Sequence, residues 1–168
     1  GIVARMGGLV ERQTAQAIAA VVNQNEEAAL EPPELDPEVD ALEREAEMLA
    51  IRILALRAPM AVDLRVIVAV LKMSGDLERI GDYASSIARR AGKVEVLDGA
   101  ISFSALRAMA RLVQENLHMA VESMVENDAE RAQEVWKADT AVDELYTTMF
   151  RELVTYMMED PRKIGPCI

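Results

Sequence analysis

The feature that most constrains this sequence is a series of apolar residues spaced alternately by three and four positions. The clearest series occupies residues 39–60, where seven apolar side chains follow one another at these steps. The spacing places them on one side of an α-helix, as in helical bundles. The chain also has only 4% aromatic residues, and no segment alternates apolar and polar residues as a strand does. The sequence therefore predicts an all-α fold of long, packed helices.

Five antiparallel helices are expected, at residues 1–29, 36–57, 60–91, 103–127 and 130–158. The pair Pro32-Pro33 predicts a break after the first helix. Asp36 precedes another proline and has the form of an N-cap, so the second helix should begin there. Ala58-Pro59 separates the second helix from the third, and Gly92 should end the third. Residues 93–103 are expected to form a connector.

The second part of the chain repeats the first. A shift of 103 positions aligns residues 6–42 with residues 109–145 without a gap, and twelve of the 37 aligned pairs are identical. Such self-similarity predicts two copies of one helical unit. We expect a first three-helix repeat over residues 1–92 and a second over residues 103–168. The second repeat should contain two helices, because the counterpart of the third helix would begin where the chain ends.

Charge and hydropathy argue against several classes of function. The net charge of −11 disfavours binding to nucleic acid or to an anionic membrane. No apolar segment is long enough to span a bilayer, so no direct membrane insertion is expected. A single cysteine, Cys167, fits a reducing compartment, and the N-terminus lacks the design of a signal peptide. These features predict a soluble, cytoplasmic protein.

Three pairs of carboxylates are spaced four residues apart, so the two members of each pair lie on the same face of a helix. The pairs are Asp36 with Asp40, Glu78 with Asp82, and Asp139 with Asp143. Carboxylates on successive turns can chelate or bridge metal ions, and the first and last pairs occupy the same position in the two repeats. The alternative is that they are solvated acids, which favour helix starts through the macrodipole. We therefore regard the six residues as candidate ligands for divalent or ferric ions.

Residues suited to catalysis are scarce. His118 is the single histidine, and it follows Glu115 at the spacing of half a di-iron motif. Cys167 has no histidine near it in the sequence, and no glycine-rich phosphate loop is present. We predict no catalytic residues. The rival interpretation is a carboxylate-bridged metal-binding bundle with redox or hydrolytic activity, which needs more histidine ligands or an open coordination site. A third interpretation is a helical bundle whose acidic pairs are solvated and inert.

The second repeat should leave an apolar surface partly uncovered, along the seam of Val142, Leu145, Met149, Leu153 and Tyr156. Exposed apolar surface of this size normally contacts a partner, so dimerisation or helix exchange is expected, giving a homodimer. Two glycines in the third helix, Gly75 and Gly81, are poor helix formers and predict a close backbone approach by a neighbouring helix. The alternative is that they are tolerated surface glycines.

Residues 76–82 read DLERIGD, residues 63–65 read DLR, and both repeats contain D-x-x-V-D-x-L. Over nearly the whole chain, these motifs resemble the PhoU family, regulators of bacterial phosphate uptake. The resemblance implies two three-helix bundles side by side, with acidic motifs that in some members hold iron or zinc clusters. The corresponding residues are Asp36, Asp40, Glu78, Asp82, Asp139 and Asp143. It also implies a negative regulator of the phosphate regulon, acting between the ATPase subunit of the phosphate ABC transporter and a sensor histidine kinase.

Overall fold

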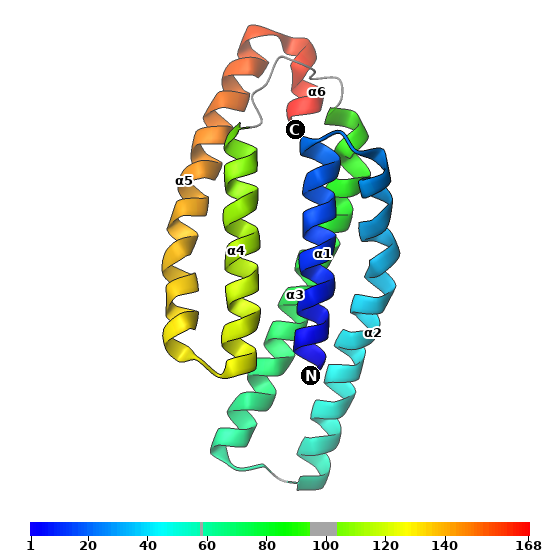
Figure 1. The fold of residues 1–168 in the computed structure, drawn as a ribbon, viewed down its shortest axis with the longest axis vertical. Helices are drawn as coiled ribbons and strands as arrows, with labels where there is room; N and C mark the ends of the chain where they lie inside the picture. Colours follow the sequence, from blue (N-terminus) through cyan, green and yellow to red (C-terminus); the bar gives the residue numbers. More distant parts are fainter. Residues whose placement is uncertain (58, 95–103) are drawn as a thin grey trace.

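The computed structural model describes residues 1–57, 59–94 and 104–168, and in these residues it consists of helices joined by short turns (Figure 1). The all-α prediction is therefore confirmed. The long helices are α1 (Ile2–Val22), α2 (Glu26–Arg57), α3 (Ala61–Val94), α4 (Ser104–Glu126) and α5 (Ala129–Glu159). A 3₁₀ turn (Pro161–Lys163) and the short α6 (Ile164–Cys167) follow.

Two predicted boundaries fall partly or wholly outside the described residues. The predicted break at Ala58 lies outside the described residues, and so do residues 95–103 of the expected connector. The predicted end of the third helix at Gly92 is wrong by two residues, since α3 continues to Val94.

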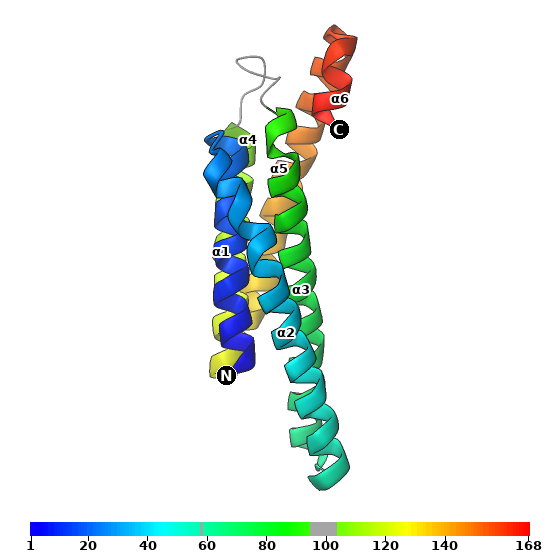
Figure 2. The same ribbon diagram turned by 90° about the vertical axis from the view of Figure 1, so that its right-hand side faces the viewer.

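The first three helices form an antiparallel bundle, and α4 and α5 form a second antiparallel pair beside it (Figures 1 and 2). The two groups meet where α1 lies against α4. The helices α2 and α3 are longer than α1 and project, at their linked ends, beyond the N-terminus of α1 and beyond the α4–α5 turn.

One apolar core joins the two repeats. It takes buried side chains from four helices, namely Val3, Met6, Val10, Val39, Leu42, Leu77, Leu117 and Val121. Toward the C-terminal end of α1 the buried residues are small. There Ala17 packs with Ala84 and Ala88, and a separate alanine cluster lies beyond it. Small side chains let the backbones of α1, α2 and α3 approach closely at this end, which brings their polar groups within reach of one another.

The two repeats turn at equivalent places. Gln24 (φ 51°) lies between α1 and α2, and Asn127 (φ 57°) lies between α4 and α5, exactly 103 positions later. Both adopt the left-handed conformation that a tight turn requires. The side chain of Asn25 accepts a hydrogen bond from the Ala28 amide at 3.2 Å, and Asp128 caps α5 in the same way. The internal repeat predicted from the sequence is thus present in the backbone conformation.

The predicted junction between the first two helices is wrong. α1 ends at Val22 rather than at residue 29, and α2 begins at Glu26 rather than at Asp36. Pro32 and Pro33 therefore lie inside α2, although each removes a backbone donor. Pro32 is fully buried, and its carbonyl oxygen accepts a hydrogen bond from Gln13 Nε2 at 2.9 Å. Packing against α1 thus overrides the local preference of the prolines.

The apolar seam of α5 is only half-covered, as the sequence predicted. No residue of α5 is fully buried, and Val142, Leu145, Met149, Leu153 and Tyr156 are all half-buried.

Among the described residues, no helix combines the length and the apolar character needed to cross a bilayer.

Candidate functional site

Asp36 lies at the centre of a polar network that joins the first three helices. Its Oδ1 accepts hydrogen bonds from Gln13 Nε2 on α1 and from Ser85 Oγ on α3, each at 2.7 Å. Its Oδ2 lies 3.4 Å from a guanidinium nitrogen of Arg89. Gln13 and Ser85 are both fully buried. The carboxylate therefore satisfies two buried donors, a structural task that the sequence did not indicate.

Gly81 is required by the side chain of Gln13. A Cβ atom at this position would lie 2.7 Å from Gln13 Oε1, closer than real Cβ contacts allow. The close neighbour of Gly81 is therefore a side chain of α1, whereas the sequence predicted a close approach of backbone. The surroundings of Gly75 are less crowded, because a Cβ atom added there would lie an ordinary 3.5 Å from Glu43 Oε1.

Four carboxylates form what we call the acidic ridge, defined as Asp40 and Glu43 on α2 with Glu78 and Asp82 on α3. Partial burial raises the pKa of Glu78, and the negative charges of Asp82, Glu43 and Asp40 raise it further. Partial burial likewise raises the pKa of Glu43, with contributions from Glu47, Asp40 and Asp82. The two helices thus bring together carboxylates that repel one another. Sequence reasoning missed Glu43, although it lies three residues after Asp40 on the same helical face.

The negative charge of the acidic ridge attracts cations, and a basic side chain of the same chain compensates part of that charge. A guanidinium nitrogen of Arg44 lies 3.8 Å from an Asp40 carboxylate oxygen. Across the described residues, no three carboxylate, histidine or cysteine side chains come together as ligands of one ion. The donor set is made of carboxylates, which suits hard cations. In this conformation the side chains fit a metal ion by charge, whereas their positions do not form a coordination shell.

Asp139 and Asp143 lie on the exposed surface of α5. Asp139 is the repeat counterpart of Asp36, yet it has none of the buried partners that surround Asp36 in the first repeat. The carbonyl oxygen of Asp143 accepts a hydrogen bond from Thr147 Oγ1 at 2.9 Å, an ordinary interaction within a helix. The two pairs that correspond in sequence therefore occupy different environments.

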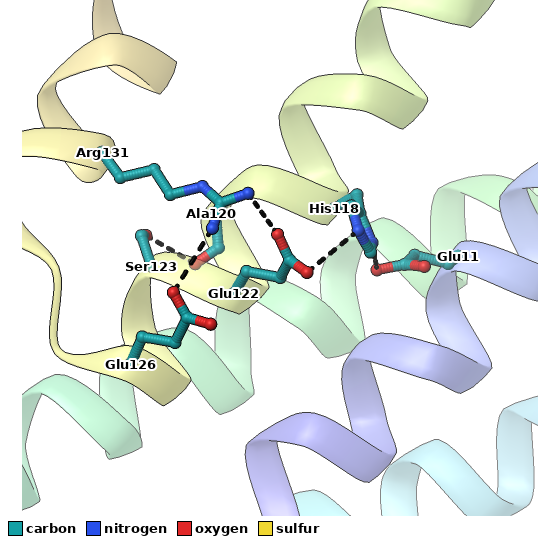
Figure 3. A network of polar contacts seen from close by, with 7 residues as sticks. All are labelled: Glu11, His118, Ala120, Glu122, Ser123, Glu126 and Arg131. Carbon is teal, nitrogen blue, oxygen red and sulfur yellow. Dashed lines mark hydrogen bonds and ion pairs between the residues drawn. The ribbon is translucent and has the colours of Figure 1, made fainter.

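A second polar network joins the repeats and is shown in Figure 3. His118 on α4 places Nδ1 3.2 Å from Glu11 of α1 and Nε2 3.3 Å from Glu122 of its own helix. Arg131 of α5 pairs with Glu122, and it also reaches Glu126 at 3.3 Å. Both ring nitrogens face carboxylate oxygens, so a doubly protonated imidazole can donate to both, and a neutral one to a single partner. No local spacing in the sequence links Glu11 to His118, which explains why this network was missed.

The other residues considered for chemistry, Glu115 and Cys167, lie in ordinary surroundings. In the described part of the chain Glu115 pairs with Arg111 at 3.5 Å, as ordinary helix neighbours do. Partial burial raises the pKa of the Cys167 thiol, which favours the protonated, less nucleophilic form.

The comparison with protein families identifies two matches in this chain. The model of the PhoU domain matches residues 3–91 and residues 106–165. These ranges correspond to α1–α3 and to the helices from α4 to α6.

Among curated proteins, the chain is similar to two relatives named phosphate-specific transport system accessory protein PhoU homolog. The relative from Caulobacter vibrioides is 45% identical over 98% of this chain and 72% of its own length. The relative from Zymomonas mobilis is 41% identical over 99% of this chain and 70% of its own length. The chain thus spans about 70% of the length of these relatives.

Two solved structures have the same fold. The crystal structure of PhoU from Pseudomonas aeruginosa matches with a TM-score of 0.94 and 40% identity, over 99% of this chain and 80% of that one. The phosphate transport system regulatory protein PhoU from Streptococcus pneumoniae matches with a TM-score of 0.85, over 95% of this chain and 75% of that one. At 23% identity, the second match supports the fold alone.

Proposed function

This chain belongs to the PhoU family, and from that premise we propose that it is a regulatory accessory protein of a phosphate transport system. The observation that carries the proposal is the similarity over 98–99% of the chain to relatives named as accessory proteins of that system. The doubled match to the PhoU domain supports it, because both repeats of the chain are included.

We propose that the protein acts as a negative regulator of the phosphate regulon, without catalytic turnover. Its partners would be the ATPase subunit of the phosphate transporter and a sensor histidine kinase, which it would contact in the cytoplasm as a homodimer. The long helices support an adaptor role, since they present rigid faces to partner proteins. The half-covered seam of α5 supports self-association, because burial of half-exposed apolar side chains such as Met149 and Leu153 against a partner is favourable.

Affinity capture tests the proposed partners. The tagged protein would be expressed in its source organism and isolated from phosphate-replete and phosphate-starved cells. We expect the transporter ATPase subunit and the sensor kinase to be enriched in the phosphate-replete sample, as identified by mass spectrometry. An untagged strain controls for background. Equal recovery of both partners from tagged and untagged strains would contradict the proposal.

We also propose that the acidic ridge binds a divalent or ferric ion, with iron or zinc as the first candidates. The support is electrostatic. Burial and mutual repulsion raise the pKa of Glu78 and of Glu43, and a bound cation would remove that repulsion. Because the positions of the side chains do not form a coordination shell in this conformation, binding would require rotamer changes in the ridge.

Equilibrium dialysis against Zn²⁺ and Fe³⁺ tests this second proposal. The Glu78→Ala/Asp82→Ala variant should lose binding, whereas the Asp139→Ala/Asp143→Ala variant reports any contribution of the exposed pair on α5. Binding by the Glu78→Ala/Asp82→Ala variant at the level of the unmodified protein would reject the ridge as a metal site. Loss of binding in the α5 variant would place the ion in the second repeat.

A further inference from the structure

The joint between the two repeats contains a polar contact beside its apolar core. Glu11 of α1 meets His118 of α4 (Figure 3). The contact lies next to the close approach of Gly7 to Val121, one helical turn further along α1. The buried side chains of the core, such as Leu117, carry no ionisable group. A change of pH therefore acts on the contact between Glu11 and His118, and leaves the core unchanged.

The imidazole of His118 lies between two carboxylates that belong to different helices. Its Nδ1 is 3.2 Å from Oε1 of Glu11, and its Nε2 is 3.3 Å from Oε1 of Glu122. The side chain of His118 is 56% exposed, whereas those of Glu11 and Glu122 are 33% and 36% exposed. Solvent thus reaches the ring, which can gain or lose a proton while the helices stay packed.

The two helices that pack most closely against α4 are α1 and α5. On α1 the charged residues besides Glu11 are Arg5 and Arg12, and both pair with glutamates of α2. On α4 itself, Glu115 lies within one turn of the ring and pairs with Arg111 at 3.5 Å. These charges are engaged elsewhere, so Glu11 is the charged group that α1 directs at the ring.

The two carboxylates beside the ring are held unequally. Arg131 of α5 pairs with Glu122, and Glu122 lies one turn from the ring on the same helix. Among the described residues, Glu11 has no cation or donor other than the imidazole, so its side chain can turn toward water. A neutral imidazole has one N–H and one lone pair, and can donate to only one carboxylate. The fixed Glu122 retains that N–H, which leaves the lone pair of Nδ1 facing Glu11.

We propose that Glu11 and His118 form a protonation-dependent latch between the two repeats. The doubly protonated ring donates to both carboxylates and ties α1 to α4. The neutral ring donates from Nε2 to Glu122 and releases Glu11. The latch therefore stabilises the joint at the acidic end of the range in which histidine titrates, and this stabilisation is lost as the pH rises through that range. The core alone then holds the repeats together. The latch involves neither the acidic ridge nor the seam of α5, so its failure would leave the proposed function in place.

A double-mutant cycle on the whole chain tests the latch. Glu11→Gln and His118→Gln each keep a polar side chain that does not titrate, and both lie in partly exposed positions. Melting temperatures of the unmodified protein, the two single variants and the double variant would be measured at pH 5.5 and at pH 8. We expect the two positions to be coupled by about 1–3 °C at pH 5.5 and to be uncoupled at pH 8.

The control is a pair that joins two helices without a histidine. Arg5 of α1 and Glu38 of α2 lie 4.0 Å apart. The corresponding cycle with Arg5→Gln and Glu38→Gln should give the same coupling at both pH values. An equal change with pH in this pair would overturn the latch, because histidine would not be its cause.

Nuclear magnetic resonance tests the protonation state directly. His118 is the single histidine of the chain, so protein labelled with ¹⁵N-histidine gives one pair of imidazole nitrogen signals. We expect both nitrogens to be protonated at pH 5.5 and only Nε2 at pH 8. A neutral ring protonated on Nδ1 would keep its bond to Glu11 and would overturn the latch. A coupling between Glu11 and His118 that is absent at pH 5.5, or that persists unchanged at pH 8, would overturn it as well.

Discussion

Gly7 of α1 faces Val121 of α4 with no room for a side chain between them. A Cβ atom built on Gly7 would lie 2.5 Å from Cγ1 and 2.8 Å from Cγ2 of Val121. Val121 belongs to the core that joins the two repeats. The glycine thus sets how closely α1 and α4 approach, and with them the two halves of the molecule.

Replacing Gly7 should weaken this contact. Because Val121 is buried, it cannot move aside freely, and Gly7→Ala should lower the free energy of unfolding by about 1–3 kcal/mol. Gly8→Ala is the matched control, since no atom lies within 4 Å of the Cβ position there. It should raise stability by about 0.5–1 kcal/mol through helix propensity. Urea denaturation measures both, and equal effects of the two variants would contradict the close approach.

Gly81 should be equally intolerant of a side chain. Gln13 Oε1 lies only 2.7 Å from the position that the Cβ atom would take, and hydrogen bonds to Pro32 and Asp36 hold the Gln13 side chain in place. Gly81→Ala should therefore cost about 1–3 kcal/mol of stability. Gly75→Ala in the same helix should be neutral or slightly stabilising, because its contact with Glu43 is ordinary. Thermal unfolding of the two variants distinguishes these outcomes, and a stable Gly81→Ala would show that Gln13 can rearrange.

Removal of the Asp36 carboxylate should leave two buried donors without an acceptor. Asp36→Ala removes the acceptor of the Ser85 hydroxyl and one of the two acceptors of the Gln13 amide, which keeps Pro32, so we expect a loss of about 1–3 kcal/mol in unfolding free energy. The repeat counterpart Asp139 is exposed, and Asp139→Ala should stay within about 0.5 kcal/mol of the unmodified protein. The difference between the two variants in urea denaturation is the result to measure. Similar losses would mean that the network does not stabilise the first bundle.

The acidic ridge should make stability depend on pH. Burial and repulsion raise the pKa of Glu78 in the folded state, so folding favours its protonated form. The stabilisation that protonated Glu78 provides is fully present below the ordinary carboxyl pKa. This stabilisation is lost as the pH rises through the raised pKa of the folded state. Glu78→Gln stays neutral at every pH and avoids this loss. The variant should be more stable than the unmodified protein by a few tenths of a kcal/mol at pH 7, and equally stable near pH 3.

Thermal melts between pH 3 and pH 7 measure this difference. Glu34→Gln removes an exposed carboxylate outside the ridge and controls for the general effect of one negative charge. A stabilisation by Glu78→Gln that persists unchanged at pH 3 would contradict the assigned cause.

The sequence allowed the helices to be predicted, but not the environment of each polar residue. Apolar steps such as Val39 to Leu42 recur on one face, and this period identifies a helix wherever it occurs. The prediction of a helix boundary at Pro32 was wrong for a physical reason. Local rules treat a proline as a break, whereas burial and the Gln13 amide hold Pro32 inside α2. The turn could have been placed from the repeat, because Gln24 and Asn127 correspond in the aligned sequences.

The candidate site was predicted in part. Spacing identified Glu78 and Asp82 as a pair, and the raised pKa of Glu78 follows in part from that proximity. Spacing did not distinguish Asp36 from Asp139, since their difference arises from donors on α1 and α3 that only the fold brings near Asp36. The contact between Glu11 and His118 spans 107 positions, and no local pattern predicts it.

The regulatory role is tested most directly by a reporter gene under a phosphate-responsive promoter in the source organism. Reporter activity would be measured at high and low phosphate in the parent strain, in a strain that lacks the gene, and in that strain complemented with it. We predict that the parent strain represses the reporter at high phosphate, that the deletion strain leaves it on, and that complementation restores repression. Unchanged reporter activity and phosphate uptake in the deletion strain would contradict a regulatory role in phosphate transport.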